Sequence, residues 1–473
     1  MKKGVYKGIL SCILGPFAFA LALLLLPGEV FTHEMRCAIG TLLWMVCWWL
    51  LPPVDYPVIG LLPIALNALF PMIPMSDIIS QYASDSIILV LSGMIITASW
   101  ESTGLNKRIA TAFLNLVGTS VRAQVMFWFL LSTALSAILP NLVVAATISP
   151  IAMSMLKYVG EGDIANSKAG SMVVMSVAWG AGLGGMATPI GSASNLVVIE
   201  YLEQVSGREY MYVDWVIRFA PIMLTLLVTC TLYVFAISPK NMQLAGSREY
   251  LASVRAGMGR MTRDEGLCFL VFLTAIILAF TRSLYAELLP GLAPAYAFAA
   301  CAIILFLIPG KSSRRIVNWK TVERGVDWGL LYMFGGALSL GKLLTGTGAD
   351  VAIGTLIGGA GISGTAGLVF VIVTFTLAMS DLTSNGATAS MCLPITMSIA
   401  SALGTNATPL LYITAIGINL SFSMPTSIRA IPVGYGLKPS FLAKRGIVLS
   451  AIIIAEMTLL GWALIKFWPA FSQ

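Results

Sequence analysis

Apolar runs recur along the whole chain and are separated by short polar stretches. Each run is near the roughly 17–25 residues that a bilayer-spanning helix needs, or reaches that length with its flanks. A membrane β-barrel would instead show alternating segments of about ten residues. The pattern predicts an all-α polytopic membrane protein with about eleven transmembrane helices. The predicted spans are 7–27, 36–51, 55–72, 86–103, 169–202, 213–237, 265–283, 293–308, 326–345, 409–436 and 446–468.

Two further segments, 121–156 and 363–403, are predicted to form re-entrant hairpins. They share a pattern, because "ILPNLVVAATISPIAMSM" in the first can be laid over "LTSNGATASMCLPITMSI" in the second. Asn141 then falls on Asn385, and a proline follows at the same distance in both. Each hairpin has a polar tip, "SAILPNL" in the first and "SDLTSNG" in the second. The chain therefore carries the same polar kink twice.

Two of the predicted helices are interrupted by glycine and proline. Helix 169–202 contains "GAGLGGMATPIGSASNLVVIEYL", and helix 409–436 contains "NLSFSMPTSIRAIPVGYG". Backbone groups freed by such residues cannot face lipid, so they must line protein or a water-filled cavity. One isolated kink would be ordinary packing, but paired interruptions in corresponding positions indicate an inverted-repeat secondary transporter with its site near the midplane.

The chain is accordingly divided into an N-terminal transmembrane helix and two repeats joined by a linker. An odd number of predicted crossings separates the repeats, so the second copy is inverted. The linker contains arginines at spacings compatible with a helix on the cytoplasmic surface. The N-terminal run is too long for a signal peptide and lacks a small-x-small cleavage site. The boundaries are 1–35 for the first helix, 36–237 for the first repeat, 238–264 for the linker and 265–473 for the second repeat.

Composition supports a membrane protein and explains the positive charge. The 473 residues are 58% hydrophobic and 10% charged, whereas a soluble protein has about 25% charged residues. The net charge of +7 follows the positive-inside rule if the N-terminus is cytoplasmic and the C-terminus lies outside an inner (plasma) membrane. Basicity of this kind does not indicate nucleic-acid binding. All but seven of the 28 basic residues then lie inside, the exceptions being Arg36, Arg208, Arg218, Arg282, Lys342, Arg429 and Lys466.

Residue usage disfavours several other classes of protein. The only histidine is His33, and the seven cysteines are scattered without CxxC spacing, so neither a metal cofactor site nor a disulfide framework is expected. The chain has no GxxxxGK[ST] motif, so ATP is not expected to drive it directly. The sequence shows no nucleophile–base pair of the kind that an enzyme active site would need. A channel would need a continuous pore, whereas two closed hairpins favour alternating access.

Three motifs resemble those of the divalent anion/sodium symporter family, within the larger ion-transporter superfamily. They are "GLNKRIA" at 104–110, "GGMATPIGSASN" at 184–195 and "TSNGATASMCLPI" at 383–395. The resemblance implies eleven helices plus two hairpins, a homodimer, and an elevator motion of one domain. It also implies an anionic substrate, with a C4-type dicarboxylate favoured and sulfate or a sulfonate as alternatives. Sodium would be the coupling ion, with no other cofactor.

The coupling mode and the rival function stay open. The chain is expected to act as a sodium-coupled symporter or as an anion exchanger. The alternative is a sodium/proton antiporter or another inorganic ion transporter of the same superfamily. An antiporter needs core carboxylates that exchange protons for sodium, and only Asp381 clearly qualifies.

The resemblance also implies site residues at the two tips and the two breaks. The family's Ser-Asn-Thr tips are replaced here by Pro140-Asn141-Leu142 and Ser384-Asn385-Gly386, so both asparagines remain and both threonines are absent. The first sodium site would keep Ser136, Asn141 and Gly191, and the second Ser380 and Asn385. The expected substrate-binding residues are Asn141, Ser192, Asn195, Asn385, Thr426, Ser427 and Arg429.

Arg429 stands where the family has an asparagine in its second break. An ionisable residue at bilayer depth is a functional hypothesis by default. The guanidinium would bind a substrate carboxylate as a bidentate fork, replace the second sodium ion with a fixed charge, or pair with Asp381. The second of these would favour anion exchange over sodium-driven uptake, because a tethered cation cannot dissipate a gradient.

Overall fold

The computed structural model describes residues 2–113, 118–310, 315–352 and 364–473. The secondary structure within these ranges is helical. Outside the helices, the backbone of these residues forms two isolated β-bridges. The all-α fold expected from the apolar pattern is therefore confirmed.

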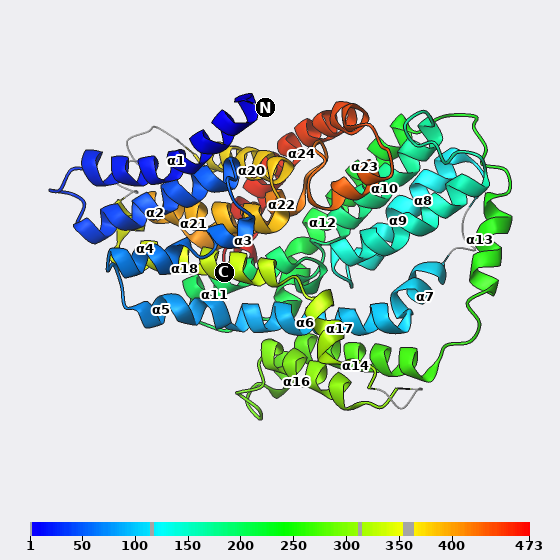
Figure 1. Cartoon of the computed structure of the whole chain (residues 1–473), viewed down its shortest axis with the longest axis horizontal. Helices are drawn as coiled ribbons and strands as arrows, with labels where there is room; N and C mark the ends of the chain where they lie inside the picture. Colours follow the sequence, from blue (N-terminus) through cyan, green and yellow to red (C-terminus); the bar gives the residue numbers. More distant parts are fainter. Residues whose placement is uncertain (1, 114–117, 311–314, 353–363) are drawn as a thin grey trace.

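Helices α1 to α5 pack at one end of the molecule, and α6 runs from there toward the other end, where α7 lies (Figure 1). The expected span 55–72 is not one helix here. It is divided at Gly60, where a Cβ would lie 2.5 Å from the Tyr332 carbonyl oxygen, and a proline is the second residue of each half. The elements are α1 (Lys2–Leu25), α2 (His33–Leu50), α3 (Tyr56–Ile59), α4 (Leu62–Leu69), α5 (Met75–Ser80), η1 (Gln81–Ala83), α6 (Asp85–Thr103) and α7 (Leu105–Thr111).

The first kinked region, which is the first predicted hairpin with the helix break that follows it, extends to the opposite end of the molecule, where α8, α9 and α10 lie, while α11 and α12 lie nearer the middle (Figure 1). Gly180 and Gly184, one turn apart in α10, face the backbone of α8 at Phe129 and Thr133. Small residues at this spacing let two helix backbones approach closely. The elements are α8 (Val121–Ser136), α9 (Asn141–Tyr158), α10 (Lys168–Gly184), η3 (Pro189–Gly191), α11 (Ala193–Ser206) and α12 (Tyr212–Ile237).

The remaining helices follow a short surface helix, α13 (Ser247–Ala256), in the region of the predicted linker. Helices α14 and α16 pack beside α6, and α20 packs against both α22 and α24. The elements are α14 (Arg263–Phe280), α15 (Arg282–Tyr285), α16 (Pro294–Leu307), α17 (Trp319–Gly325), α18 (Trp328–Thr347), α20 (Thr365–Leu382), α21 (Asn385–Ala402), α22 (Ala407–Asn419), η5 (Ser427–Arg429), α23 (Ala430–Gly434) and α24 (Pro439–Phe467).

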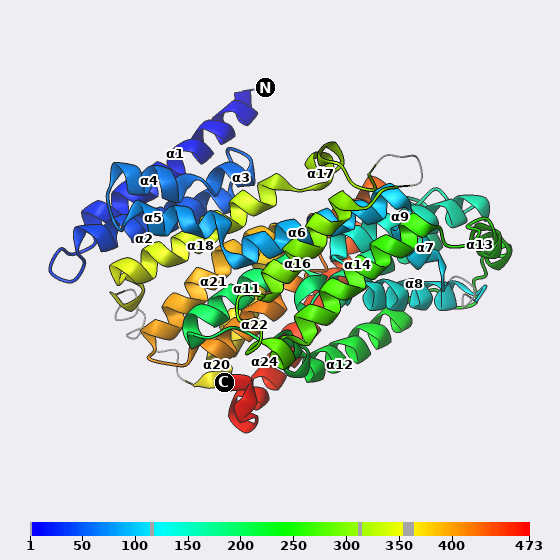
Figure 2. The same cartoon turned by 90° about the horizontal axis from the view of Figure 1, so that it is seen from below.

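The two kinked regions meet in the middle of the molecule. Helix α11 packs against α21 and α22, and the turn η5 packs against α9 and α10. The first and last parts of the chain lie on opposite faces, and α17 shares a face with the start of the chain (Figure 2). Segments far apart in the sequence are thus brought to one centre.

Five described helical segments are long and apolar enough to cross a membrane by length and composition. Two of them, Tyr212–Ile237 and Pro439–Phe467, are only 22% and 33% buried within the protein, so most of their apolar surface is free to face lipid. Met75–Thr103, 61% buried, is an interior element. The other two, Asn141–Tyr158 and Thr365–Leu382, are arms of the predicted hairpins, and their re-entrant character stays a prediction.

Candidate functional site

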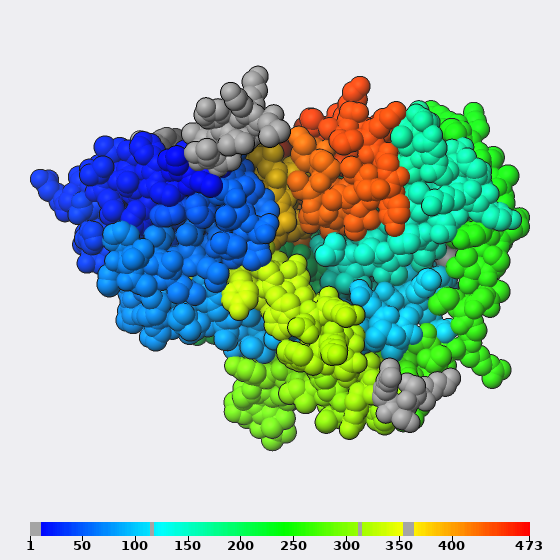
Figure 3. All heavy atoms as spheres, viewed as in Figure 1, coloured from blue at the N-terminus to red at the C-terminus, as the bar shows by residue number. Residues whose placement is uncertain are grey.

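A cavity of about 440 Å³ lies where the two kinked regions meet. Both hairpin tips line it, through Pro140–Val143 and Ser384–Gly386, and both helix breaks reach it, through Ser192–Ser194 and Ser427. Helix α6 and the junction of α17 with α18 complete the wall. On the face shown in Figure 3 the surface is hollowed where segments from both halves of the chain meet. Asn141 and Asn385 therefore line one cavity despite their separation in sequence.

The charged side chains that line this cavity are acidic. They are Glu101 of α6 and Asp327 before α18, and no lysine or arginine is among its described lining residues. Positive potential for an anion must therefore come from elsewhere. The N-termini of α9 and α21 reach the cavity at Asn141 and Asn385, and each end carries unpaired N–H groups and a partial positive charge.

Asn385, the first residue of α21, is the clearest candidate for a ligand-binding side chain. Ser384 caps the helix by accepting a hydrogen bond from the Ala387 N–H at 3.2 Å, which leaves the Asn385 amide free of a structural task. Asn385 is 7% exposed, yet neither its Nδ2 nor its Oδ1 has a hydrogen-bond partner among the described residues. A buried amide without partners costs about 1–3 kcal/mol, so this side chain is placed to bind something that enters the cavity.

A group of oxygen atoms converges at the first break, beside Asn141. A Cβ built on Gly191 would lie 2.7 Å from the Ser136 carbonyl oxygen and 2.6 Å from that of Gly185. A Cβ built on Gly185 would lie 2.9 Å from Asn141 Nδ2 and 3.1 Å from the Gly191 carbonyl oxygen. The Ser136 hydroxyl donates to the Ala181 carbonyl at 2.7 Å. The three residues of the first predicted sodium site are thus brought together, and the carbonyl oxygens of Ser136 and Gly191 are hard donors of the kind that a sodium ion prefers.

Asn195 has a different place from the one expected. It is fully buried, and its Nδ2 donates to the carbonyls of Gly185 and Thr188, both at 2.8 Å. Its Oδ1 accepts from Asn419 Nδ2 at 2.7 Å. The amide is therefore engaged by the protein, and Asn195 holds the first break to the end of α22 without lining the cavity.

The remaining expected residues divide into two groups. Ser192 and Ser427 line the cavity. The Ser192 hydroxyl shares a 2.8 Å hydrogen bond with that of Ser194, and Ser427 has a φ of 50°, a left-handed backbone that non-glycine residues rarely adopt. Thr426 lies behind the wall, where its hydroxyl donates to the Asp381 carbonyl at 3.0 Å.

Arg429 is enclosed by the protein, with 1% of its surface exposed. Its Nε donates to the Met424 carbonyl at 3.2 Å, and its Nη1 to the Ser421 carbonyl at 3.0 Å. Its Nη2 donates to the Ser380 carbonyl at 3.4 Å and to Thr426 Oγ1 at 3.0 Å. The guanidinium thus faces four acceptor oxygens and does not line the cavity, so direct substrate contact is not seen here.

Asp381 does not form a direct ion pair with Arg429. Ion pairs of the described side chains instead join Arg108 to Glu265, Arg218 to Asp214 and Arg282 to Glu209. Asp381 Oδ1 instead accepts from the backbone N–H groups of residues 422 and 423 at 2.9 Å, and of residue 424 at 3.4 Å. The carboxylate and the guanidinium therefore bind opposite polar groups of the same loop.

The second predicted sodium site is only partly assembled. The Ser380 hydroxyl donates to the Ile418 carbonyl at 2.8 Å and contacts Ser421 Oγ at 3.2 Å, while the Ser380 carbonyl accepts from Arg429. Asn385, the other expected ligand, faces the cavity, and its side chain has no hydrogen bond with Arg429. The oxygen atoms of this site face a guanidinium.

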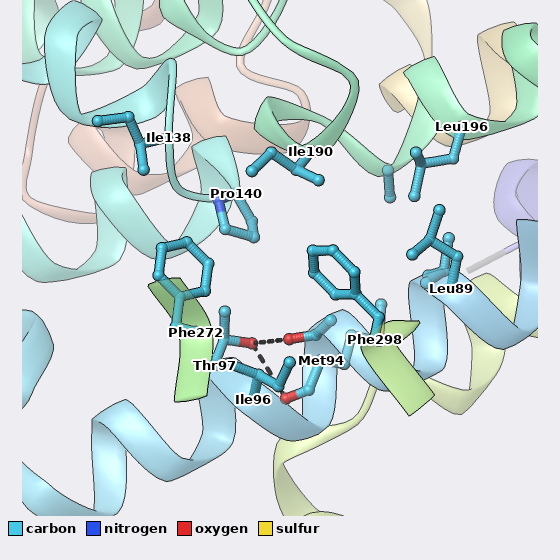
Figure 4. Close-up of a pocket in the computed structure, with 13 residues that line it drawn as sticks. Leu89, Met94, Ile96, Thr97, Ile138, Pro140, Ile190, Leu196, Phe272 and Phe298 are labelled. Carbon is cyan, nitrogen blue, oxygen red and sulfur yellow. Dashed lines mark hydrogen bonds between the residues drawn. The ribbon is translucent and has the colours of Figure 1, made fainter. Parts of the chain in front are cut away.

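An apolar pocket of about 80 Å³ adjoins the cavity and shares Met94, Thr97, Pro140 and Ala193 with it. Figure 4 shows Pro140 and neighbouring apolar side chains of the first tip and break on one side, and Phe272 of α14 and Phe298 of α16 on the other. The Thr97 hydroxyl donates to carbonyls of its own helix, at 3.0 Å. A pocket with such a lining stays dry, so the pocket itself offers no polar contact to a ligand.

Sequence reasoning missed the acidic residues of the wall, Glu101 and Asp327, and the partner of Asn195. Asn419 carried a usable signal, because it directly precedes the second break. Glu101 gave no such sequence signal, because an acidic residue near a helix end is ordinarily a solvated side chain.

Comparisons with known proteins show the family and the fold of the chain. A family model described as citrate transporter matches residues 42–417. The chain is 28% identical over 451 residues to the sodium-dependent dicarboxylate transporter SdcS of Staphylococcus saprophyticus, covering 90% of this chain and 85% of that protein. It is also 28% identical over 469 residues to the protein of that name from Staphylococcus aureus (strain bovine RF122), with 94% and 89% covered. Among solved structures, the YdaH transporter of Alcanivorax borkumensis shares the fold, with a TM-score of 0.58 and 14% identity over 86% of this chain and 90% of that one.

Proposed function

The chain belongs to the citrate transporter family, and we propose that it is a secondary active transporter of small dianions, with a C4-type dicarboxylate as its substrate. It is a multi-pass membrane transporter and not an enzyme. The proposal rests on one observation, which is that both polar tips and both helix breaks line a single cavity. The names of the staphylococcal relatives, sodium-dependent dicarboxylate transporters, support it.

The substrate carboxylates bind at the N-termini of α9 and α21 in this proposal. Asn141 and Asn385 supply side-chain donors there, and the hydroxyls of Ser192 and Ser427 add further contacts. The cavity volume of about 440 Å³ falls within the about 300–1,000 Å³ of small-molecule sites. Because the charged residues that line the cavity, Glu101 and Asp327, are acidic, the helix ends alone must attract the dianion. A nearby cation would strengthen its binding.

We propose that this cation is a sodium ion bound at the first helix break. The carbonyl oxygens of Ser136, Gly185 and Gly191 would hold it, with Asn141 between the ion and the substrate. A sodium ion bound there favours the dianion, and by linkage the dianion favours sodium to the same degree. This reciprocity is what couples the two solutes in a symporter.

The transport step that we propose is an elevator motion. The unit formed by the two hairpins and the broken helices would move against α6, α14 and α16. The dry pocket of Figure 4 supports this, because it lies between these two groups of helices and its walls are apolar. At the start of α6 the Ser86 hydroxyl contacts the Leu196 carbonyl at 3.1 Å and Glu200 Oε2 at 2.7 Å, both in α11, so the motion would have to exchange this polar contact while the apolar walls of the pocket slide past each other. By resemblance we also propose a homodimer in the plasma membrane, with a cytoplasmic N-terminus.

The test is uptake by purified protein in proteoliposomes. Labelled succinate and labelled sulfate are offered with and without an inward sodium gradient, and with and without internal counter-anion. Succinate entry is expected, and Asn385→Ala should abolish it, while Asn166→Ala, a matched change on the exposed surface, should leave it unchanged. Entry of sulfate alone would reassign the substrate, and sodium/proton exchange without anion entry would favour the antiporter.

A further inference from the structure

The contacts of Arg429 are those of a bound cation. Its guanidinium faces the carbonyl oxygens of Ser380, Ser421 and Met424 and the hydroxyl of Thr426, at 3.0–3.4 Å. These oxygens come from the end of α20 and from the second break, the two segments that build the second predicted ion site. An arginine that only filled space would not need hydrogen-bond acceptors from both α20 and the second break.

The first half of the chain presents a matching arrangement around Ser136, which falls on Ser380 when the two sequences are laid over each other. The Ser136 hydroxyl donates to a carbonyl of α10, and the Ser380 hydroxyl donates to a carbonyl of α22. The Ser136 carbonyl faces Gly191 of the first break, whereas the Ser380 carbonyl accepts from Arg429. The same backbone oxygen is therefore open to an ion in one half and bound by a side chain in the other.

Asp381 supplies the opposite charge without touching the guanidinium. It accepts three backbone N–H groups from residues 422–424, and the carbonyls of Ser421 and Met424 accept from Arg429. The backbone of residues 421–424 thus links the buried Asp381 carboxylate to the buried Arg429 guanidinium through hydrogen bonds. A buried charge is tolerated when it is hydrogen-bonded and a counter-charge is near, and here Arg429 donates four hydrogen bonds while Asp381 accepts three from the same loop.

We propose that Arg429 is a tethered cation that replaces a second coupling sodium ion, and that Asp381 is the positioning residue that holds the loop around it. The inference rests on the proposed function, since it specifies the ion coupling of the same site. Arg429 cannot leave with the substrate, so it holds a fixed positive charge behind the cavity wall without moving charge down a gradient. Transport should therefore couple to the single sodium ion of the first break.

The experiment measures how labelled succinate uptake into proteoliposomes depends on external sodium, with choline keeping ionic strength constant. Wild-type uptake should rise with a Hill coefficient of about one, because a Hill coefficient cannot exceed the number of coupled sites. Arg429→Asn, which opens the second site to an ion, should raise the coefficient above one and increase the sodium concentration needed for half-maximal uptake. Arg255→Gln, an exposed change on α13, is the matched control and should behave as wild type.

Two further variants keep the proposal falsifiable if Arg429→Asn does not fold. Arg429→Lys keeps the charge and should keep a Hill coefficient of about one, even if the maximal rate falls. Asp381→Asn with Arg429→Gln removes both charges and should gain dependence on a second sodium ion. A wild-type coefficient near two, or a coefficient unchanged in both neutral variants, would overturn the inference. Failure of wild-type protein to move succinate at all would instead overturn the proposed function.

Discussion

Substituting alanine for Gly191 tests the placement of sodium at the first break. The Gly191 backbone does not adopt the left-handed conformation, so alanine is allowed there and only the space around its Cβ matters. That Cβ would lie 2.6 Å from the Gly185 carbonyl oxygen and 2.7 Å from that of Ser136. Both distances are shorter than van der Waals contact, so the two oxygens must separate.

The size of the effect follows from this overlap. Forcing an extra methyl group into a packed site costs about 1–3 kcal/mol, and the atoms that must move are the proposed ligands of the ion. If that cost falls on the sodium-bound state, the sodium concentration for half-maximal uptake should rise about 5- to 150-fold. Maximal uptake at saturating sodium should fall less, because Asn385 and the helix ends are untouched.

The assay is sodium-dependent uptake of labelled succinate, with a sodium-induced thermal shift of the purified protein as a second readout. Gly182→Ala is the matched control, because its Cβ would meet nothing closer than the Asn419 carbonyl oxygen at 3.8 Å. It should keep wild-type sodium affinity. An unchanged sodium dependence in folded Gly191→Ala protein would refute the assignment of the ion to these oxygens.

Three other predictions concern the site and the topology. Asn385→Ala should abolish succinate binding while leaving the melting temperature near that of wild type, because its amide has no partner in the protein; a large loss of stability would contradict this. Asn195→Ala should lower the melting temperature, since three hydrogen bonds at the break are lost at about 1 kcal/mol each, and unchanged stability would show that the break holds without it. Single cysteines replacing Arg255 and Gln473 should react with impermeant reagents from opposite sides of the membrane, and labelling from one side would refute the predicted inversion.

Helix positions could be predicted from the sequence wherever apolar length and Gly/Pro interruptions dominate. The hairpin arms of 121–156 and the division of 169–202 correspond to described helices within a few residues. The prediction of one continuous helix over 55–72 was wrong. Its division at Gly60 depends on the close approach of this residue to α18, which no local sequence pattern reveals. The short helices α5, α7 and α17 were missed because they are too brief to show a period.

Site residues were predictable by type and position but not by partner. The repeated asparagines indicated that Asn141 and Asn385 belong together, and the structure places both on one cavity wall. Asn195 looked equally available, yet its partners are backbone carbonyls and Asn419. The partners of Arg429 are mainly backbone carbonyls as well, and these are present at every residue, so only the folded chain shows which of them converge.

The central claim, that the cavity between the two tips binds and carries a dicarboxylate, is tested most directly by succinate counterflow. Proteoliposomes containing purified wild-type protein are loaded with unlabelled succinate and sodium and then diluted into a trace of labelled succinate. Wild-type vesicles should accumulate label above its equilibrium level, and vesicles with Asn141→Ala and Asn385→Ala combined should accumulate none. Wild-type vesicles that take up no more label than protein-free liposomes, or a double variant that matches wild type, would contradict the account.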